Sequence, residues 1–237
     1  MIVYNMKKTI GPGQKKPAKN TVPGKKGDDT RKMILAAARQ IFAAHPYNAA
    51  SIRMIATQGD FYHGLIRYHF PSKAGIFEAV MEDACRSLVQ ANKEWLVEIS
   101  TFPPEKALST YLDRFIEYFQ KQPAVLRIII NNLSHENPAT LPGYHHLTGF
   151  LADTRRDFEA IFPNLFATGD VSRFLSSLNA LILHFLGAGS IEAQIMGFPS
   201  QSRDYLQWVK ETLFFIFLPV LETAVRQSSE SALDTGK

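Results

Sequence analysis

The stretch from Tyr62 to Lys73, YHGLIRYHFPSK, concentrates side chains that can bind a polyanion. Tyrosine, histidine, arginine and lysine occur there without an intervening acidic residue. Such groups donate hydrogen bonds to phosphate oxygens, and several of them can also reach the edges of bases. The residue types therefore predict contact with nucleic acid rather than bond-making chemistry.

Catalytic and metal-binding patterns are missing from the sequence. It has no glycine-rich phosphate loop, no G-x-S-x-G elbow and no H-E-x-x-H. His145 and His146 are adjacent, but no cysteine or carboxylate lies at ligand spacing from them. The single cysteine, Cys85, excludes an intrachain disulfide and suits a reducing cytoplasm. We interpret it as a packed apolar side chain, with a redox sensor as the alternative. We expect no enzyme activity, no cofactor and no metal site.

Charge is distributed unevenly along the chain. Residues 1–27 carry seven lysines and no acidic residue, whereas residues 74–237 carry more acidic than basic residues. Residues 1–28 also contain many glycines and prolines, so we expect a disordered basic arm that adds phosphate attraction. The first helix is expected to begin near Asp29 or Thr30 and to end at Pro46. Residues 29–73 then form the DNA-binding unit.

Two further short helices complete this unit. Ser51 is expected to cap the second helix, and Gln58-Gly59-Asp60 carries the residues of a tight turn. The third helix runs from Tyr62 to about Tyr68, with Phe61 and Ile66 as its apolar anchors. Two helices joined by a tight turn can place the second one in a DNA major groove. The sequence therefore predicts a helix-turn-helix.

We expect DNA contacts from side chains around the turn and on the third helix. Residues before the turn would reach phosphates, and the first turn of the third helix would reach base edges. Taken singly, the aromatic and histidine residues would be ordinary surface side chains, and only their joint spacing favours DNA. The expected contacts are Ser51, Arg53, Tyr62, His63, Gly64, Leu65, Arg67, Tyr68, His69 and Lys73.

The segment SIRMIATQGDFYHGLIRYHFPSK resembles the tetracycline-repressor (TetR) family of bacterial transcription regulators. The family pattern is a capping Ser or Thr, an Ile-Ala pair, a turn, a small residue in the third helix and an aromatic stretch ending Phe-x-Ser-Lys. The matching positions are Ile55, Ala56, Gly64, Tyr68, His69, Phe70, Ser72 and Lys73. Asp60 departs from the usual turn glycine. Leu65 stands where a threonine is common, which puts one polar contact in doubt.

Residues 74–227 are expected to form a helical body continuous with the DNA-binding unit. Apolar residues at helical spacing, interrupted by prolines, mark its first helices. These are expected at about 74–99, 105–121, 123–130 and 144–162. Residues 228–237 are serine-rich and are expected to be a flexible tail.

The last two helices, expected at about 170–195 and 202–225, are the most apolar. The second is apolar nearly all round, so it must be covered on every side. We expect a homodimer in which a twin covers the outer side, and the family resemblance implies the same arrangement. The uncharged stretch 174–191 is long enough for a membrane span, but its polar residues favour a buried helix. The expected interface residues are Phe174, Leu181, Phe185, Trp208, Phe214, Phe217 and Leu221.

The family resemblance further implies that the body binds a small-molecule effector and that effector and DNA weaken each other's binding. Charged residues are scarce on the inner faces, so an apolar effector is expected. Asn131, His145 and His184 are the polar candidates to orient it. Apolar residues at helical spacing are core more often than ligand wall, so the wall is predicted only as a group. Its members are Trp95, Phe115, Phe119, Leu126, Ile130, Phe150, Phe158 and Leu178.

The sequence thus predicts an all-α protein, with an N-terminal three-helix helix-turn-helix DNA-binding domain followed by a helical ligand-binding and dimerisation domain. The expected function is that of a cytoplasmic ligand-responsive regulator, most simply a repressor. It would bind a near-palindromic double-stranded operator as a homodimer, without a membrane. The alternative is a helical binding or architectural protein that uses its N-terminal fold for non-specific DNA or protein contact. Affinity for an operator against random DNA separates the two.

Overall fold

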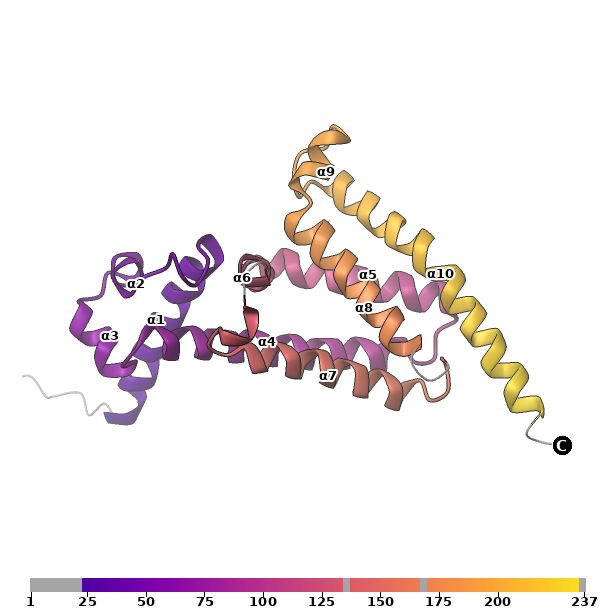
Figure 1. Cartoon of the computed structure of the whole chain (residues 1–237), viewed down its shortest axis with the longest axis horizontal. Helices are drawn as coiled ribbons and strands as arrows, with labels where there is room; N and C mark the ends of the chain where they lie inside the picture. Colours follow the sequence, from indigo (N-terminus) through magenta and orange to yellow (C-terminus); the bar gives the residue numbers. More distant parts are fainter. Residues whose placement is uncertain (1–22, 134–136, 167–169, 235–237) are drawn as a thin grey trace, which may run out of the picture.

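The computed structural model describes residues 23–133, 137–166 and 170–234, and within these ranges it contains helices and no strand (Figure 1). The all-α prediction is therefore confirmed. Residues 1–22, which hold most of the expected basic arm, and residues 235–237 of the expected tail lie outside the described part of the chain.

The N-terminal head consists of α1 (Pro23–Ala44), α2 (Ile52–Gly59) and α3 (His63–His69). Helix α1 begins earlier than the expected Asp29 or Thr30. Proline suits a helix start, because its missing N–H would have no partner in the first turn. Apolar side chains from all three helices, among them Phe42, form one core that continues into the body.

The turn between α2 and α3 has the geometry that its residues predict. The Ser51 hydroxyl accepts a hydrogen bond from the backbone N–H of Met54 at 3.2 Å, so the expected N-cap of α2 is confirmed. Asp60 ends the helix in the left-handed region at φ 53°. Aspartate tolerates this conformation better than most residues, so it can replace the glycine usual in the family. The ring of Phe61 folds over Gly59, where a Cβ atom would lie 2.0 Å from it.

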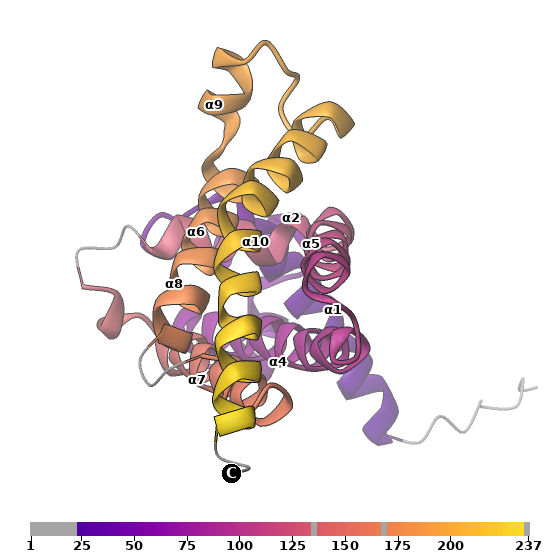
Figure 2. The ribbon, with the colours of Figure 1, turned by 90° about the vertical axis from the view of Figure 1, so that its right-hand side faces the viewer.

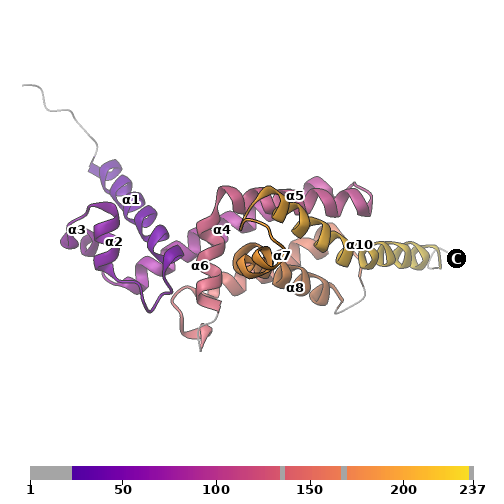
Figure 3. The ribbon, with the colours of Figure 1, turned by 90° about the horizontal axis from the view of Figure 1, so that it is seen from above.

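Helix α4 (Lys73–Ile99) connects the head to the body. Its 27 residues span about 40 Å at 1.5 Å per residue. Helix α7 (Tyr144–Ile161) packs along it, and of the other body helices one runs nearly alongside α4 and the rest cross it or lie obliquely (Figures 1 and 3). Cys85 is buried in α4, and burial raises the pKa of its thiol to about 11, so the interpretation as a packed side chain is confirmed. The elements between α4 and α7 are α5 (Pro104–Lys121), α6 (Pro123–Leu133) and the short 3₁₀ helix η1 (Pro138–Thr140).

The expected single helix over about 170–195 is interrupted, and the prediction of its continuity is wrong. It consists of α8 (Asp170–Leu183), the π-helical turn η2 (His184–Ala188) and α9 (Ser190–Ile195). The interruption coincides with two glycines in tight packing. A Cβ atom on Gly187 would lie 1.5 Å from the Ile130 side chain, and one on Gly189 would lie 1.9 Å from the Tyr205 hydroxyl. Beyond the break, α9 stands away from the rest of the body (Figure 2).

Helix α10 (Arg203–Asp234) closes the body and ends at the opposite end of the molecule from the head (Figure 1). It continues past the expected end near Val225 and through part of the expected tail. Residues 170–188, spanning α8 and η2, are long and apolar enough to cross a membrane by length and composition alone. Since α8 packs against α7 and α10, a helix of a folded bundle accounts for this composition.

Candidate nucleic-acid interface and internal cavity

The outer side of α3, which we define by Tyr62, His63, Arg67 and Tyr68, is exposed on the head. Tyr62 is 72% exposed and Tyr68 is 83% exposed, and His63 and Arg67 are exposed as well. On the opposite side of the same helix Ile66 is fully buried. The apolar anchor thus turns every candidate donor of this set toward solvent, which is the arrangement that a groove-binding helix requires.

The other candidate contacts near the turn have different environments. Arg53 is exposed on α2, whereas Leu65 and His69 are half-buried. The His69 ring packs edge-on against Tyr68, with ring centroids 5.1 Å apart. Gly64 is exposed, and the Tyr62 ring lies over it, at the place where a Cβ atom would meet the ring at 2.7 Å. The small residue in α3 therefore makes room for a neighbouring aromatic side chain, an intramolecular role that its sequence position did not reveal.

Lys73 has a structural role that differs from the predicted DNA contact. Its ammonium group donates hydrogen bonds to the carbonyl oxygens of Tyr47 at 2.8 Å and Ala50 at 3.0 Å. It also lies 4.2 Å from the centre of the Tyr47 ring. Burial lowers the pKa of this lysine. Two of its three N–H donors are thus used to fasten the start of α4 to the loop that follows α1.

A second attachment of head to body runs through two asparagines of α6 that sequence reasoning did not assign to it. The Asn131 amide donates to the carbonyl oxygen of Ala43 at 2.9 Å. The Asn132 side chain is buried, accepts from the Tyr47 backbone N–H at 3.0 Å and donates to the Ile128 carbonyl at 2.7 Å. The expectation that Asn131 orients an effector is therefore wrong, since its amide faces the head.

The body contains a partly open cavity of about 520 Å³ at the end of α4 that is remote from the head. Its lining comes from α4, α5, α7, α8, α10 and the loops after α4 and α7, and no charged side chain is among these described lining residues. Such a cavity suits an uncharged, largely apolar molecule. The lining residues are Leu96, Ile99, Ser100, Thr101, Phe102, Pro103, Pro104, Ala107, Leu108, Tyr111, Thr154, Phe158, Phe162, Leu165, Phe174, Leu175, Leu178, Leu221 and Val225.

The hydroxyl groups that line this cavity differ in their partners. Tyr111 donates to the side-chain oxygen of buried Asn92 at 2.8 Å, and burial raises the pKa of this tyrosine. Ser100 donates to the Val97 carbonyl at 2.8 Å. The Thr154 side chain is buried, and its hydroxyl has no hydrogen-bond partner among the described residues. A buried hydroxyl without a partner is costly, so Thr154 marks the point at which a bound molecule could supply one.

The structure divides the predicted effector-wall residues into two groups. Phe158 and Leu178 line the cavity. The other six are not among its lining residues and pack within the core, for example Phe115, whose ring centroid lies 5.5 Å from that of Trp95. Periodicity identified these side chains as inward-facing but could not say which ones border the empty space. The six are Trp95, Phe115, Phe119, Leu126, Ile130 and Phe150. The polar candidates His145 and His184 also lie outside the lining and are exposed.

The predicted dimer residues are likewise divided by the fold of the single chain. Phe174, Phe217 and Leu221 are buried in the core of the single chain, and Phe174 and Phe217 also border a surface groove between α8 and α10. The half-buried members of the predicted set are Leu181, Phe185, Trp208 and Phe214. Three apolar side chains that were not predicted are exposed on α10: Phe215 at 80%, Ile216 at 39% and Val220 at 48%.

Comparisons with known proteins agree with this architecture. Residues 34–80 match the family model for bacterial regulatory proteins of the tetR family. The chain is 27% identical over 118 residues to the HTH-type transcriptional repressor NicS of Pseudomonas putida, covering 50% of this chain and 55% of NicS. It is 35% identical over 77 residues to the HTH-type transcriptional repressor AcnR of Corynebacterium glutamicum, covering 32% of this chain and 41% of AcnR. The matches thus span about half the length of these relatives.

The fold comparison extends beyond the head. A crystal structure of a TetR-family regulator from Mesorhizobium loti superimposes with a TM-score of 0.59 at 17% sequence identity. The superposition covers 82% of this chain and 97% of that one, so the two share both the head and the helical body. Residues 34–80 therefore match the tetR family of bacterial regulatory proteins, and the head and helical body share the fold of this solved structure.

Proposed function

We propose that this protein is a cytoplasmic transcription regulator that represses its target by binding operator DNA and is released by a small uncharged molecule. The observation that carries the proposal is that α4 joins two separate sites: the outer side of α3 lies at one end of this helix, and the cavity lies at the other. The exposed outer side of α3 lies beside the start of α4, and the cavity borders Leu96 and Ile99 at its end. Lys73 and Leu96 are about 35 Å apart at 1.5 Å per residue. Two sites joined by one rigid element can bias each other's occupancy.

DNA contact by the outer side of α3 is supported by both its exposure and its chemistry. Tyrosine, histidine and arginine can donate to phosphates and base edges, and Ile66 fixes the helix so that they point outward. Arg53 on α2 adds an exposed positive charge in the same head. We assign Lys73 to fixing α4 rather than to direct DNA contact, because its ammonium binds two carbonyl oxygens.

Dimerisation is supported by the apolar surface that one chain leaves uncovered. Phe215, Ile216 and Val220 are all exposed on α10. Ile216 and Val220 border a groove that also holds the half-buried Leu181 of α8, whereas Phe215 borders a groove beside α5. A second copy that packs its own α8 and α10 here would cover these side chains. The pair would present two α3 helices, which is the arrangement that reads a near-palindromic operator.

The effector class follows from the cavity lining. None of the described lining residues is charged, which disfavours an ionised ligand, since its charge would lose hydration without gaining a counter-charge. Thr154 offers one unpartnered hydroxyl, so the molecule should carry one hydroxyl or carbonyl group on an apolar frame. Two fluorescent probes test the charge rule directly. The neutral N-phenyl-1-naphthylamine should bind, and its sulfonated analogue 8-anilinonaphthalene-1-sulfonate should bind at least about tenfold more weakly.

Operator binding is tested with the full-length protein and DNA from upstream of its own gene. Fluorescence anisotropy at about 0.15 M salt should show a preference of at least about a thousandfold over a shuffled duplex of the same composition. Equal affinity for the two duplexes would reject sequence-specific regulation and favour the architectural role. Addition of N-phenyl-1-naphthylamine should weaken operator binding if it occupies the effector cavity.

A further inference from the structure

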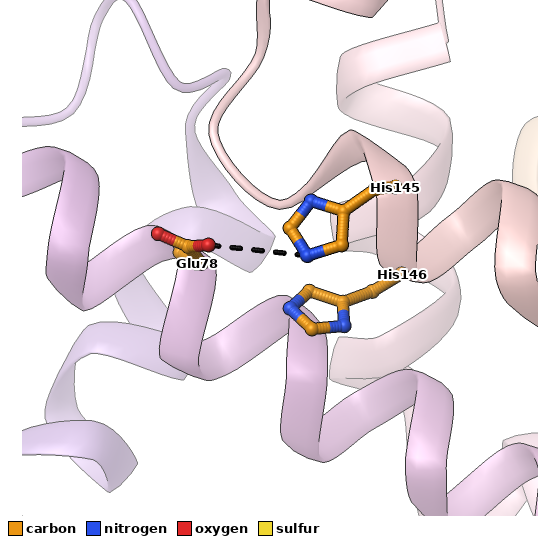
Figure 4. A group of neighbouring side chains, drawn as sticks. All are labelled: Glu78, His145 and His146. Carbon is orange, nitrogen blue, oxygen red and sulfur yellow. Dashed lines mark ion pairs between the residues drawn. The ribbon is translucent and has the colours of Figure 1, made fainter.

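Glu78 of α4 and the histidine pair at the start of α7 converge on one side of the body (Figure 4). The candidate ligand atoms of Glu78, His145 and His146 all lie within 4.8 Å of one another. The Nε2 atom of His145 is 3.9 Å from the nearer carboxylate oxygen of Glu78. Sequence spacing alone gave the histidines no carboxylate partner. The packing of α7 on α4 supplies one from a distant part of the chain.

The backbone brings these side chains together at Gly143. This residue precedes α7 with φ 73°, a conformation that favours glycine. A Cβ atom here would lie 3.1 Å from the Cα atom of Glu78 and 3.1 Å from the Cβ atom of Met81. Glycine therefore lets the first turn of α7 approach α4 beside Glu78. His145 and His146 lie in that turn, and their rings are tilted by 40° with centroids 4.0 Å apart.

We propose that Glu78, His145 and His146 bind one divalent transition-metal ion, for which Zn²⁺ is the test case. Two imidazole nitrogens and one carboxylate oxygen are donors that such ions accept, whereas Mg²⁺ and Ca²⁺ favour all-oxygen sites. Ligand atoms at about 2.1 Å from a tetrahedral zinc ion lie about 3.4 Å apart. The His145–Glu78 separation of 3.9 Å is close to this value, and none of the separations exceeds 4.8 Å. Glu78 and His145 are exposed side chains that can rotate inward. Water would complete the coordination of this open site.

The position of the site next to the head gives the bound ion a regulatory role. Glu78 follows Phe77, whose ring packs against Phe42 at 4.8 Å and Tyr47 at 4.9 Å between centroids. An ion that joins Glu78 to the start of α7 would hold the head-bound part of α4 in one position. This regulatory reading rests on the proposed function, and it requires that zinc and operator change each other's affinity by the same factor. The binding site itself does not depend on the proposed function.

The site is tested by calorimetric titration of Zn²⁺ into untagged, metal-free full-length protein, without DNA. One ion should bind per chain, and Co²⁺ should give a visible absorption band that Zn²⁺ displaces. Glu78→Gln, His145→Asn and His146→Asn should each weaken binding at least about tenfold. The matched control is His184→Asn. His184 forms a similar pair with Glu192, 2.7 Å between ring nitrogen and carboxylate oxygen, but it belongs to no described group of three ligands.

Several outcomes would overturn the proposal. Wild-type protein that binds no zinc, or ligand variants that bind zinc as tightly as wild type, would exclude the site. Circular dichroism and thermal unfolding of each variant separate lost ligation from lost folding. Substitution of the exposed Glu78 and His145 should leave both unchanged, and the half-buried His146 needs this control most. Anisotropy with operator DNA, with and without zinc, tests the regulatory role. Zinc binding without any change in operator affinity would reject that role, whereas failure to bind operator at all would reject the proposed function and leave the calorimetric result standing.

Discussion

Replacement of Thr154 by valine tests the cavity more directly than any other substitution. Its hydroxyl is buried and has no partner among the described residues. Leaving a buried polar group unsatisfied costs about 1–3 kcal/mol, and valine keeps the shape while removing that group. Threonine and valine also have similar helix propensities. Thr154→Val should therefore stabilise the ligand-free protein by about 1 kcal/mol or more, which raises Tm by about 2–4 °C per kcal/mol in a chain of this length.

Thermal unfolding followed by circular dichroism measures this change. Thr148→Val is the matched control on the same helix, because Thr148 is exposed and its hydroxyl donates to the His145 carbonyl at 3.1 Å. An exposed substitution of this kind should change stability by no more than about 0.5 kcal/mol. The contrast between the two variants isolates the effect of burying an unpartnered hydroxyl on α7.

The same substitution should reduce the cavity's preference for ligands that carry a hydroxyl group. Competition of 2-naphthol and 2-methylnaphthalene against N-phenyl-1-naphthylamine compares two molecules of similar size that differ by one hydroxyl. For each protein, the affinity for 2-naphthol is divided by the affinity for 2-methylnaphthalene. This ratio should be about fivefold higher in wild type than in Thr154→Val, which corresponds to about 1 kcal/mol. A valine variant that melts below wild type would show that the hydroxyl already has a stabilising partner. An unchanged ratio of affinities would show that Thr154 does not face the bound molecule.

Three further substitutions test the head, the dimer surface and the π-helical turn. His63→Ala combined with Tyr68→Ala should weaken operator binding at least about thirtyfold, at about 1–3 kcal/mol for each of the two contacts, without changing helicity. Retained affinity would reject the α3 surface. Phe215→Glu should yield monomers in analytical ultracentrifugation at low micromolar protein, while Val97→Glu, also exposed, should leave the dimer intact. Gly189→Ala should lower the free energy of unfolding by about 1–3 kcal/mol, because the added Cβ atom would lie 1.9 Å from the Tyr205 hydroxyl. Thermal unfolding measures this change. An unchanged Tm would show that the π-helical turn relaxes to accept the alanine.

Local sequence signals predicted the head well, because its elements depend on short-range chemistry. Ser51 caps α2 through a hydrogen bond to a residue three positions away, and Asp60 occupies the left-handed turn that its neighbours indicate. The buried side of α3 follows from Ile66, which repeats the apolar spacing set by Phe61 and continued to Phe70. These features require no knowledge of distant parts of the chain.

Features that depend on tertiary packing could not be read from the sequence. Helix α10 is apolar on several sides, so periodicity cannot tell that Phe217 faces the core and Phe215 faces solvent. The cavity wall depends on where α5, α7 and α8 leave space, which placed Phe158 at the cavity and Phe115 in a packed aromatic cluster. Glu78 meets His145 only because Gly143 permits close approach of two helices. In each case the deciding contact joins segments that are far apart in sequence.

The two attachments between head and body suggest how an effector would act under the proposed function. Helix α4 borders the cavity at its far end, whereas none of the described cavity-lining residues comes from α6. Asn132 of α6 nevertheless binds the head through the Tyr47 backbone. A molecule that displaces the end of α4 would therefore move one attachment while the other stays in place. Because Lys73 and Asn132 both bind at Tyr47, that difference in movement would rotate the head about this loop and change the direction of α3. A rotation of the head needs no unfolding, so it can be driven by the modest free energy that one small molecule supplies.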